Sequence, residues 1–410
     1  MAIVKPFRAL RPLPEQAAKV SAVPYDVVNT DEARELAEGN PLSFLHVSRP
    51  EIDLPAGTDP HSAVVYEQAA INFDRLIVQA PLIIEDEPSF YFYRLTMGDH
   101  EQTGIVACCS VDEYDNDIIR RHERTRKDKE DDRTRHIRTV RAQTGPVFVT
   151  YKPSMTIDAL AQKVAGTQPL FGFRAPDGVI HTIWRIEPGF NDEITAAFES
   201  IPYLYIADGH HRAKSASRVR EDLRSEEKEW SGIEDCNFFQ CVLFPADQVQ
   251  ILPYNRIVRN AGDLSLDDIL DKMDLDFDVM ESSAKVPDRR GRFAMYAGGQ
   301  WYSVKLRKEV TKPMKAIEGL DVTILQEKLF EPVFGIEDPR TDNRVDFVGG
   351  IRGPEAIQEL VDSGKAVVGF VLHPTTVDDL MQISDAGEIM PPKSTWFEPK
   401  LRDGLLSHLI

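Results

Sequence analysis

One segment constrains the fold more than any other: residues 203–216 read YLYIADGHHRAKSA. The apolar run at its start predicts a buried strand, Asp208-Gly209 predicts a tight turn, and the helix formers that follow predict a helix. This order places the two histidines and the arginine of residues 210–212 around a helix N-terminus. Free backbone N–H groups and the helix dipole favour an anion there.

The side chains of this segment suit phosphate chemistry. Arg212 can grip a phosphate in a bidentate fork, and Asp208 can hold a metal ion or orient an imidazole. A different interpretation is that Asp-Gly forms an ordinary turn and that His210 and His211 begin a solvated helix. Because five polar or special residues follow the apolar strand without a gap, the segment favours the functional interpretation and predicts an anion site.

Composition and charge narrow the class of protein. The chain has 410 residues, of which 42% are apolar and 28% charged, as is typical of a globular protein with two or three domains. Its net charge of −19 disfavours nucleic acid and an anionic membrane as partners. We therefore expect a small-molecule substrate, and a homodimer stays open.

Cysteine usage and hydropathy indicate the compartment. The four cysteines, Cys108, Cys109, Cys236 and Cys241, form no CxxC pair. This spacing disfavours a structural zinc site and a disulfide framework, which indicates a reducing compartment. No apolar run approaches the ~18 residues of a membrane helix, and the first residues lack a signal-peptide pattern. We expect a soluble cytoplasmic protein.

Strands and helices alternate along the chain, which predicts an α/β fold of the mixed α+β kind. The clearest predicted elements are a helix over Thr30–Glu38, a hairpin of Ser89–Met97 with Gln102–Val111, a strand over Val147–Tyr151, a hairpin of Phe293–Tyr296 with Trp301–Leu306, and a helix over Ile317–Phe330. We expect an N-terminal α+β region over 1–115, a catalytic core over 116–260 and a C-terminal α/β region over 261–410.

A second constellation lies at residues 120–141, where ten Lys or Arg stand against five Asp or Glu in an acidic chain. For most of this segment we predict a solvated helix with i,i+4 charge pairs, such as Lys127 with Asp131. We single out His122-Glu123 and the Lys127/Arg133 group, because phosphoryl transfer needs a carboxylate near the attacking hydroxyl and cations near the transferred group. A carboxylate among arginines stays ionised, as a proton acceptor must.

Two further segments complete the candidate site. The C-terminal stretch MPPKST presents Lys393, Ser394 and Thr395 after two prolines that fix the backbone. Lys393 can act as a point charge on phosphate. The alternative, left open, is a rigid strap that packs the aromatic residues after it into the core. Near the N-terminus, Tyr25 and Asp26 lie in a loop that we expect to take part in the site.

Three stretches together resemble a widespread prokaryotic family, domain-of-unknown-function family 1015: RHERT at 121–125, ADGHHR at 207–212 and MPPKST at 390–395. The sequence PYDVV at 24–28 resembles its opening motif, so the resemblance runs along nearly the whole chain. The DGHHR element also resembles the phosphate-handling motif of the ParB/sulfiredoxin-like superfamily, which includes free L-serine kinases. This resemblance implies a ParB/sulfiredoxin-like core around the motif, with additional N- and C-terminal α/β parts.

The resemblance to serine kinases implies a small-molecule phosphotransferase that forms O-phosphoserine, with ATP, ADP or pyrophosphate as donor and Mg²⁺ as cofactor. Glu123 is our own choice of base, because it precedes DGHHR and sits among cations. The expected roles are catalytic for Glu123, His210 and Asp208; phosphate- or nucleotide-binding for Gly209, His211, Arg212 and Lys393; substrate-binding for Tyr25, Asp26, His122, Ser394 and Thr395; and metal-binding for Asp208.

Two other functions stay open. The same phosphate cradle suits a phosphatase that hydrolyses phosphoserine, and a ParB-like regulatory protein would bind a nucleotide there without turnover. A sulfiredoxin-like reductase is disfavoured, because histidines stand where its reactive cysteine is expected. The sequence contains no GxxxxGK[ST] loop, so it does not identify the phosphoryl donor.

Overall fold

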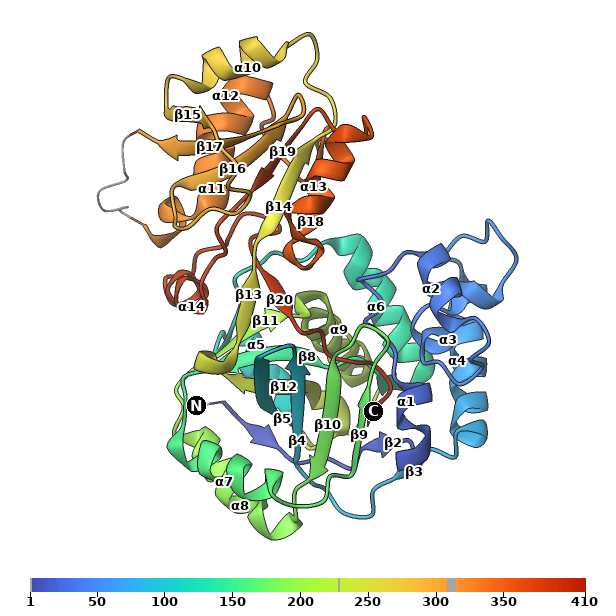
Figure 1. Ribbon diagram of the computed structural model, residues 1–410. Helices are drawn as coiled ribbons and strands as arrows, with labels where there is room; N and C mark the ends of the chain where they lie inside the picture. The colour runs from blue at the N-terminus through green and yellow to red at the C-terminus, as the bar shows by residue number, and fades with distance from the viewer. Residues whose placement is uncertain (1, 228, 308–314) are drawn as a thin grey trace. The chain divides into compact units, whose positions relative to one another are not determined.

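The chain forms two compact units in the computed structural model, which describes residues 2–227, 229–307 and 315–410 (Figure 1). The first unit comprises Met1–Val249 together with Pro399–Ile410, and the second comprises Gln250–Glu398. Both contain helices and strands, so the mixed α/β class predicted from the sequence is confirmed.

This division differs from the three regions expected from the sequence. The expected boundary at 115 falls inside the first unit, because β5 (His100–Ser110) pairs with β12 (Phe238–Pro245) in one sheet. The end of the chain differs as well, since Pro399–Ile410 returns to the first unit instead of continuing the second.

The core of the first unit is a mixed sheet in the order β6-β11-β8-β12-β5-β4-β10-β9, with β1 beside β5. β11 runs parallel to β6 and β12 parallel to β8, and the other neighbours are antiparallel. Besides β5 and β12, its strands are β1 (Val4–Lys5), β4 (Tyr91–Met97), β6 (Ile119–Arg120), β8 (Val147–Tyr151), β9 (Phe171–Arg174), β10 (Ile180–Arg185) and β11 (Leu204–Asp208).

The strands at the centre of this sheet form where the sequence is apolar. All five residues of β8 are buried, as are residues 204–207 of β11, which fits strands that lie inside a sheet covered on both faces. The predicted strand over Val147–Tyr151 is confirmed, and so is the aromatic hairpin, whose turn contains Gly98 with φ of 59°. These strands anchor the end of β11, where the predicted anion site begins.

Helices and two short strand pairs complete the first unit. The predicted helix at Thr30 is confirmed: Asn29 caps it, and Glu32 closes the capping box. The short pairs are β2 (Leu10–Arg11) with β3 (Ile83–Ile84), and β7 (Ala142–Gln143) with β21 (His408–Leu409). The helices are α1 (Ala17–Val20), α2 (Thr30–Ala37), α3 (Leu45–Ser48), α4 (Ala63–Gln79), α5 (Val111–Asp115), α6 (Lys127–Val140), α7 (Met155–Ala165), α8 (Asn191–Glu199) and α9 (His210–Glu226).

The second unit contains an antiparallel sheet in the order β15-β17-β16-β19-β14-β18, and β13 pairs with β20. Its strands are β13 (Gln250–Leu252), β14 (Tyr254–Val258), β15 (Phe277–Glu281), β16 (Arg292–Ala297), β17 (Gln300–Leu306), β18 (Val345–Gly349), β19 (Val368–Val371) and β20 (Trp396–Glu398). Its helices are α10 (Leu266–Met273), α11 (Asp321–Leu325), α12 (Glu331–Phe334), α13 (Gly353–Asp362) and α14 (Val377–Asp385).

The second unit confirms the predicted hairpin as β16 and β17. The helix predicted over Ile317–Phe330 is not continuous, because a 3-10 turn at Ala316–Gly319 precedes α11 and a π-helical turn at Gln326–Phe330 follows it. Within the described part of the chain, no helix has both the length and the apolar character that a membrane crossing requires. All four cysteines are buried and free.

Candidate functional site

The strand, turn and helix predicted around Asp208 are confirmed. β11 ends at Asp208, α9 begins at His210, and Gly209 between them has φ of 90°. Glycine suits this left-handed conformation, and a Cβ atom here would come within 3.3 Å of the Cα atom of Val147. The turn therefore places the N-terminus of a 17-residue helix, which no side chain of the described residues caps, at the end of β11.

The Asp208 carboxylate binds a lysine from the end of the chain. Its Oδ2 atom lies 2.9 Å from Nζ of Lys400, and its Oδ1 atom accepts a hydrogen bond of 2.8 Å from the N–H group of Gly209. Burial favours the neutral acid, but Lys400 and Arg212 together hold the pKa of Asp208 below its usual value. The carboxylate stays ionised and fixes an ammonium group beside the N-terminus of α9.

The sequence did not predict a role for Lys400; it predicted phosphate binding by Lys393 instead. The two lysines belong to one proline-containing segment, and nothing in its local pattern distinguishes them. Only the return of Pro399–Ile410 to the first unit brings Lys400 to Asp208.

Arg212 joins this group from the first turn of α9. Its Nη1 atom donates to the carbonyl of Pro146 at 2.8 Å, and its Nη2 atom donates to Oδ1 of Asp26 at 3.0 Å. Its guanidinium carbon lies 5.6 Å from the ring centre of Tyr25. The structure thus brings together Arg212, Tyr25 and Asp26, which the sequence placed in one site.

Two histidines and a glutamate meet near the end of β11. Nδ1 of His122 donates to the carbonyl of Ile206 at 3.0 Å, and its ring centre lies 4.5 Å from that of His210. Nδ1 of His210 lies 3.9 Å from Oε2 of Glu123. Burial lowers the pKa of His122 to about 4 and lowers the pKa of His210 well below its usual value, so both imidazoles are neutral.

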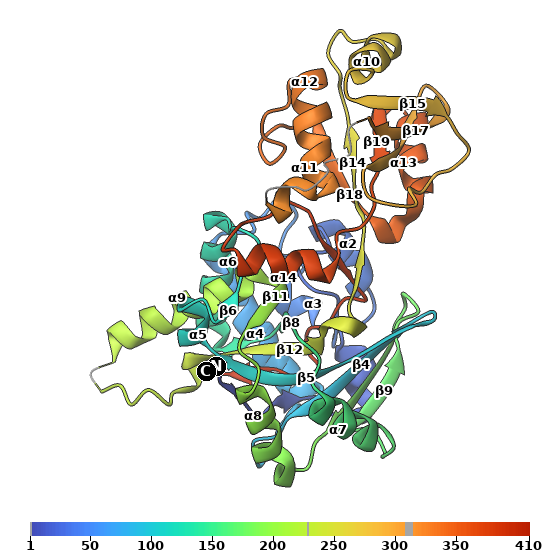
Figure 2. The ribbon, with the colours of Figure 1, turned by 90° about the vertical axis from the view of Figure 1, so that its left-hand side faces the viewer.

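His211 connects α9 to the segment that carries Glu123. Its Nε2 atom accepts a hydrogen bond of 3.0 Å from the backbone N–H group of Arg126, the N-cap residue of α6. α6 and α9 pack against each other (Figures 1 and 2). The pairing of β6 with β11 also holds this segment close, because residue 120 lies beside residue 205.

The solvated helix predicted over residues 120–141 is partly wrong. The helix forms, but Asp132, His136 and Ile137 are buried in it. Asp131, which we expected to pair along its own helix, binds Arg218 of α9 at 2.7 Å. The reason is packing: α6 contacts both α4 and α9, so its charged side chains can pair with residues of those helices.

The metal assignment of Asp208 fits this geometry poorly. Both of its carboxylate oxygens already accept from protein donors, one of them the ammonium group of Lys400, whereas Mg²⁺ needs oxygen ligands whose charge is available to it. A different group offers metal-ligand geometry: one atom each from His122, Glu123 and His210 lie within 4.8 Å of one another. Two imidazoles suit a transition metal better than Mg²⁺.

Lys393, Ser394 and Thr395 belong to the second unit, which is described by itself. The Ser394 hydroxyl donates to the carbonyl of Pro391 at 2.6 Å, and Nζ of Lys393 lies 5.4 Å from the ring centre of Tyr254. These contacts lie within the second unit, whereas the residues around Asp208 belong to the first.

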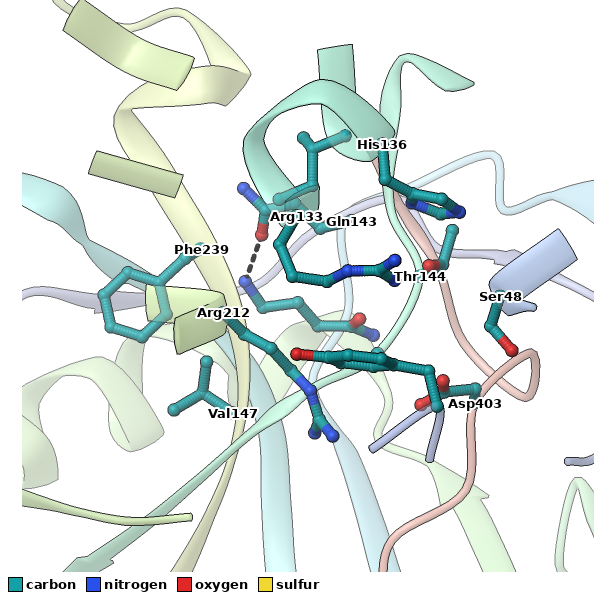
Figure 3. A pocket seen from close by; sticks show the side chains of 13 residues that line it. Ser48, Arg133, His136, Gln143, Thr144, Val147, Arg212, Phe239 and Asp403 are labelled. Carbon is teal, nitrogen blue, oxygen red and sulfur yellow. Dashed lines mark hydrogen bonds between the residues drawn. The ribbon is translucent and has the colours of Figure 1, made fainter. Parts of the chain in front are cut away.

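A cavity of about 30 Å³, partly open to solvent, adjoins Arg212 in the first unit. Figure 3 shows the guanidinium groups of Arg133 and Arg212 and the carboxylate of Asp403 around it. Burial raises the pKa of Asp403 to about 7, although Arg212 acts against it. The sequence singled out Arg133 as a cation for phosphoryl transfer, but it did not indicate Asp403. The full lining is Tyr25, Ser48, Arg133, His136, Ile137, Gln143, Thr144, Gly145, Val147, Arg212, Phe239, Gln240 and Asp403.

Comparison with known proteins gives a family match and several structural likenesses. The family described as "Protein of unknown function (DUF1015)" matches residues 4–323. None of the curated proteins matches the chain in sequence.

Three of the similar solved structures illustrate the likeness. A free serine kinase in complex with AMP is 14% identical, with a TM-score of 0.36 over 72% of this chain and 86% of its own. A conserved hypothetical protein from Pyrococcus furiosus is 13% identical, with a TM-score of 0.35 over 74% of this chain and 94% of its own. SbnI from Staphylococcus aureus, truncated at its C-terminus, is 12% identical, with a TM-score of 0.37 over 72% and 84%. Because these sequence identities and TM-scores are low, the function has to be inferred from the chemistry of the site.

Proposed function

The chain belongs to the DUF1015 family, whose description assigns no function, and we propose that it is a small-molecule phosphotransferase with a ParB/sulfiredoxin-like core. It transfers a phosphoryl group from ATP, ADP or pyrophosphate to the hydroxyl of free L-serine. The observation that carries the proposal is the group at the start of α9: a Lys400–Asp208 pair and Arg212 beside the N-terminus of the helix, which no described side chain caps.

This cationic group supports the binding of phosphate. The N–H groups at the N-terminus of α9 and the guanidinium of Arg212 all donate hydrogen bonds, and phosphate oxygens only accept them. The ammonium group of Lys400, which Asp208 holds in place at 2.9 Å, adds further N–H donors. Donors that are fixed before the reaction stabilise the charge of the transferred group without reorganisation.

Glu123 is the proposed general base. It lies next to His210 at 3.9 Å, and its side chain is 37% exposed, so an acceptor hydroxyl can reach it. In the proposed step Glu123 takes the hydroxyl proton, and the hydroxyl oxygen forms a bond to phosphorus. The bond from phosphorus to the leaving oxygen of the donor breaks, and its electron pair leaves with the nucleotide or phosphate.

Mg²⁺ belongs to this proposal as an ion that the donor carries on its phosphate oxygens. Such ions commonly keep several waters and take few protein ligands. Because Lys400 already neutralises Asp208, the chain's own part is to orient the donor and accept the proton.

A coupled assay for phosphoryl transfer tests the proposal, with each donor and L-serine as acceptor. We expect Arg212→Ala and Glu123→Gln each to lower kcat/KM on the order of 100-fold. Arg34→Ala is the matched control, because Arg34 is an exposed arginine that pairs with Asp31 on α2. Wild-type turnover of the Arg212→Ala variant would contradict the proposed role of Arg212 in phosphate binding.

The same assay separates the two other functions. Phosphate release from phosphoserine without an acceptor would identify a phosphatase. Nucleotide binding without any product would identify a regulatory protein.

A further inference from the structure

Three side chains of metal-ligating type meet where β6 and β11 end. The two strands are parallel neighbours, so their carboxyl ends lie at the same edge of the sheet (Figure 2). His122 and Glu123 follow β6 in a bend of the main chain, and His210 begins α9 after β11. One ligand atom from each of these residues lies within 4.8 Å of the other two. The pairing of the strands thus brings two imidazoles and one carboxylate together.

His122 has the second-nitrogen hydrogen bond that is typical of a metal ligand. Its Nδ1 atom donates to the carbonyl of Ile206 at 3.0 Å, which leaves the lone pair of the neutral ring on Nε2. Metal-binding histidines commonly donate their other ring nitrogen to a backbone carbonyl, because this contact fixes both the tautomer and the direction of the ring. His122 is only 1% exposed, so packing also holds the ring in this orientation.

His210 lacks a hydrogen-bond partner for one of its ring nitrogens. Among the described residues no group reaches its Nε2 atom, although His210 is only 5% exposed. Its Nδ1 atom lies 3.9 Å from Oε2 of Glu123, which is too far for a hydrogen bond. Two ligands that each lie ~2.1 Å from a zinc ion stand ~3.4 Å apart in a tetrahedral site. A small movement of the Glu123 side chain, which is 37% exposed, gives that separation.

We propose that His122, Glu123 and His210 bind a divalent transition-metal ion of the Zn²⁺ class. Two imidazoles and one carboxylate are a ligand set of zinc enzymes, and the set leaves one coordination position for a water or substrate oxygen. Mg²⁺ prefers oxygen ligands, so the two imidazoles select against it. An ordered water molecule would satisfy Nε2 of His210 alone, whereas a metal ion uses all three side chains.

Metal binding and proton acceptance compete for Glu123, the proposed general base. A carboxylate that gives an electron pair to Zn²⁺ is a much weaker base toward the acceptor hydroxyl. We therefore expect a bound transition metal to inhibit phosphoryl transfer, whereas Mg²⁺ carried by the donor does not occupy this site. Only this consequence rests on the proposed function, because the metal site itself is inferred from geometry.

Isothermal titration calorimetry on the full, metal-free chain tests the site, with Zn²⁺ and Mg²⁺ as the probes. We expect one Zn²⁺ ion to bind per chain and Mg²⁺ to bind at least about tenfold more weakly. Glu123→Gln and His210→Ala should each weaken Zn²⁺ binding at least about tenfold. His100→Ala is the matched control, because His100 contacts Gln102 in the β4–β5 hairpin. Unchanged Zn²⁺ affinity in Glu123→Gln and His210→Ala contradicts the proposal.

Co²⁺ absorption tests the wild-type chain without any substitution. Co²⁺ commonly replaces Zn²⁺ in sites of this kind, and its visible bands report the geometry of its ligands. We expect equimolar Co²⁺ to give the intense bands of a tetrahedral site, and equimolar Zn²⁺ to abolish them. If only the weak spectrum of the octahedral aqua ion appears, the proposal is wrong.

Turnover with each donor at saturating Mg²⁺, with and without Zn²⁺, separates this inference from the proposed function. If Zn²⁺ binds through Glu123 and His210 but no donor supports transfer, the function fails and the metal site stands. If the chain phosphorylates L-serine and Zn²⁺ binding is independent of both residues, the metal site fails and the function stands. In an active chain, Zn²⁺ that fills the site without lowering turnover contradicts the competition for Glu123.

Discussion

The ion pairs around Asp208 in the first unit bury more of their cations than the Arg340–Asp338 pair of the second unit does. In the first unit, the Lys400 and Asp208 side chains are 18% and 35% exposed, and Arg212 is 10% exposed in its pair with an aspartate. In the second unit, Arg340 and Asp338 pair with 58% and 35% of their side chains exposed. Burying charge is costly, so clustered, shielded charges point to a functional site, whereas exposed pairs are typical of a solvated surface.

The comparison indicates which charged side chains belong to a functional site. Around Asp208, cations from α9 and from the end of the chain meet one carboxylate, and a cavity with unpartnered acceptors adjoins them. Buried charge alone does not identify a site, however, because Arg256 of the second unit is also buried and donates to main-chain carbonyls. In the first unit, several charged groups meet beside a cavity.

The largest effect should come from Lys400 of the C-terminal segment. We expect Lys400→Ala to lower phosphoryl transfer on the order of 100-fold, because it removes a fixed cation and leaves Asp208 without its partner. Lys393→Ala in the second unit is the matched change, measured in the same coupled assay. If Lys393→Ala lost as much activity as Lys400→Ala, Lys393 of the second unit would also take part in phosphate binding.

The second effect concerns Asp403 and pH. Because burial raises its pKa to about 7, the folded chain keeps a proton that the unfolded chain releases near pH ~4. The resulting stabilisation is complete below pH ~4 and is lost as the pH rises through about 7. Between pH 5 and 8 the wild type should lose about 2–3 kcal/mol more than Asp403→Asn, as measured by urea unfolding.

Gly209→Ala should have a smaller effect on stability. At φ of 90° an L side chain is strained, and we expect a loss of about 1–2 kcal/mol in the free energy of unfolding. Gly189→Ala is the control, since a Cβ atom there meets nothing within 4 Å and its φ is not positive. Similar losses for both variants would show that the turn after β11 needs no glycine.

The smallest effect is expected for the exposed pair of the second unit. Arg340→Ala should change the free energy of unfolding by less than about 1 kcal/mol, because solvent screens this pair. Thermal unfolding at low and high salt measures it. A loss as large as that of Gly209→Ala would show that the second unit also depends on its surface charges.

The sequence predicted local features well. The strand over Val147–Tyr151, the aromatic hairpin and the β11–α9 turn have the bounds or nearly the bounds expected, because apolar runs, Asp-Gly turns and caps act on neighbouring residues. The sequence did not predict ion pairs between side chains of different helices. Asp131 binds Arg218 of α9, and no periodicity within α6 encodes that choice.

By itself, the sequence determined that an apolar strand would end at Asp208 and that a helix would present His210 and Arg212 at its start. Short-range sterics and hydrogen bonding decide this without the rest of the chain. Only the tertiary structure decided that Lys400, 192 residues further on, would bind Asp208, and that Asp403 would line a cavity with Arg212. Such contacts depend on where the sheet and the final segment pack together, and no local pattern records that.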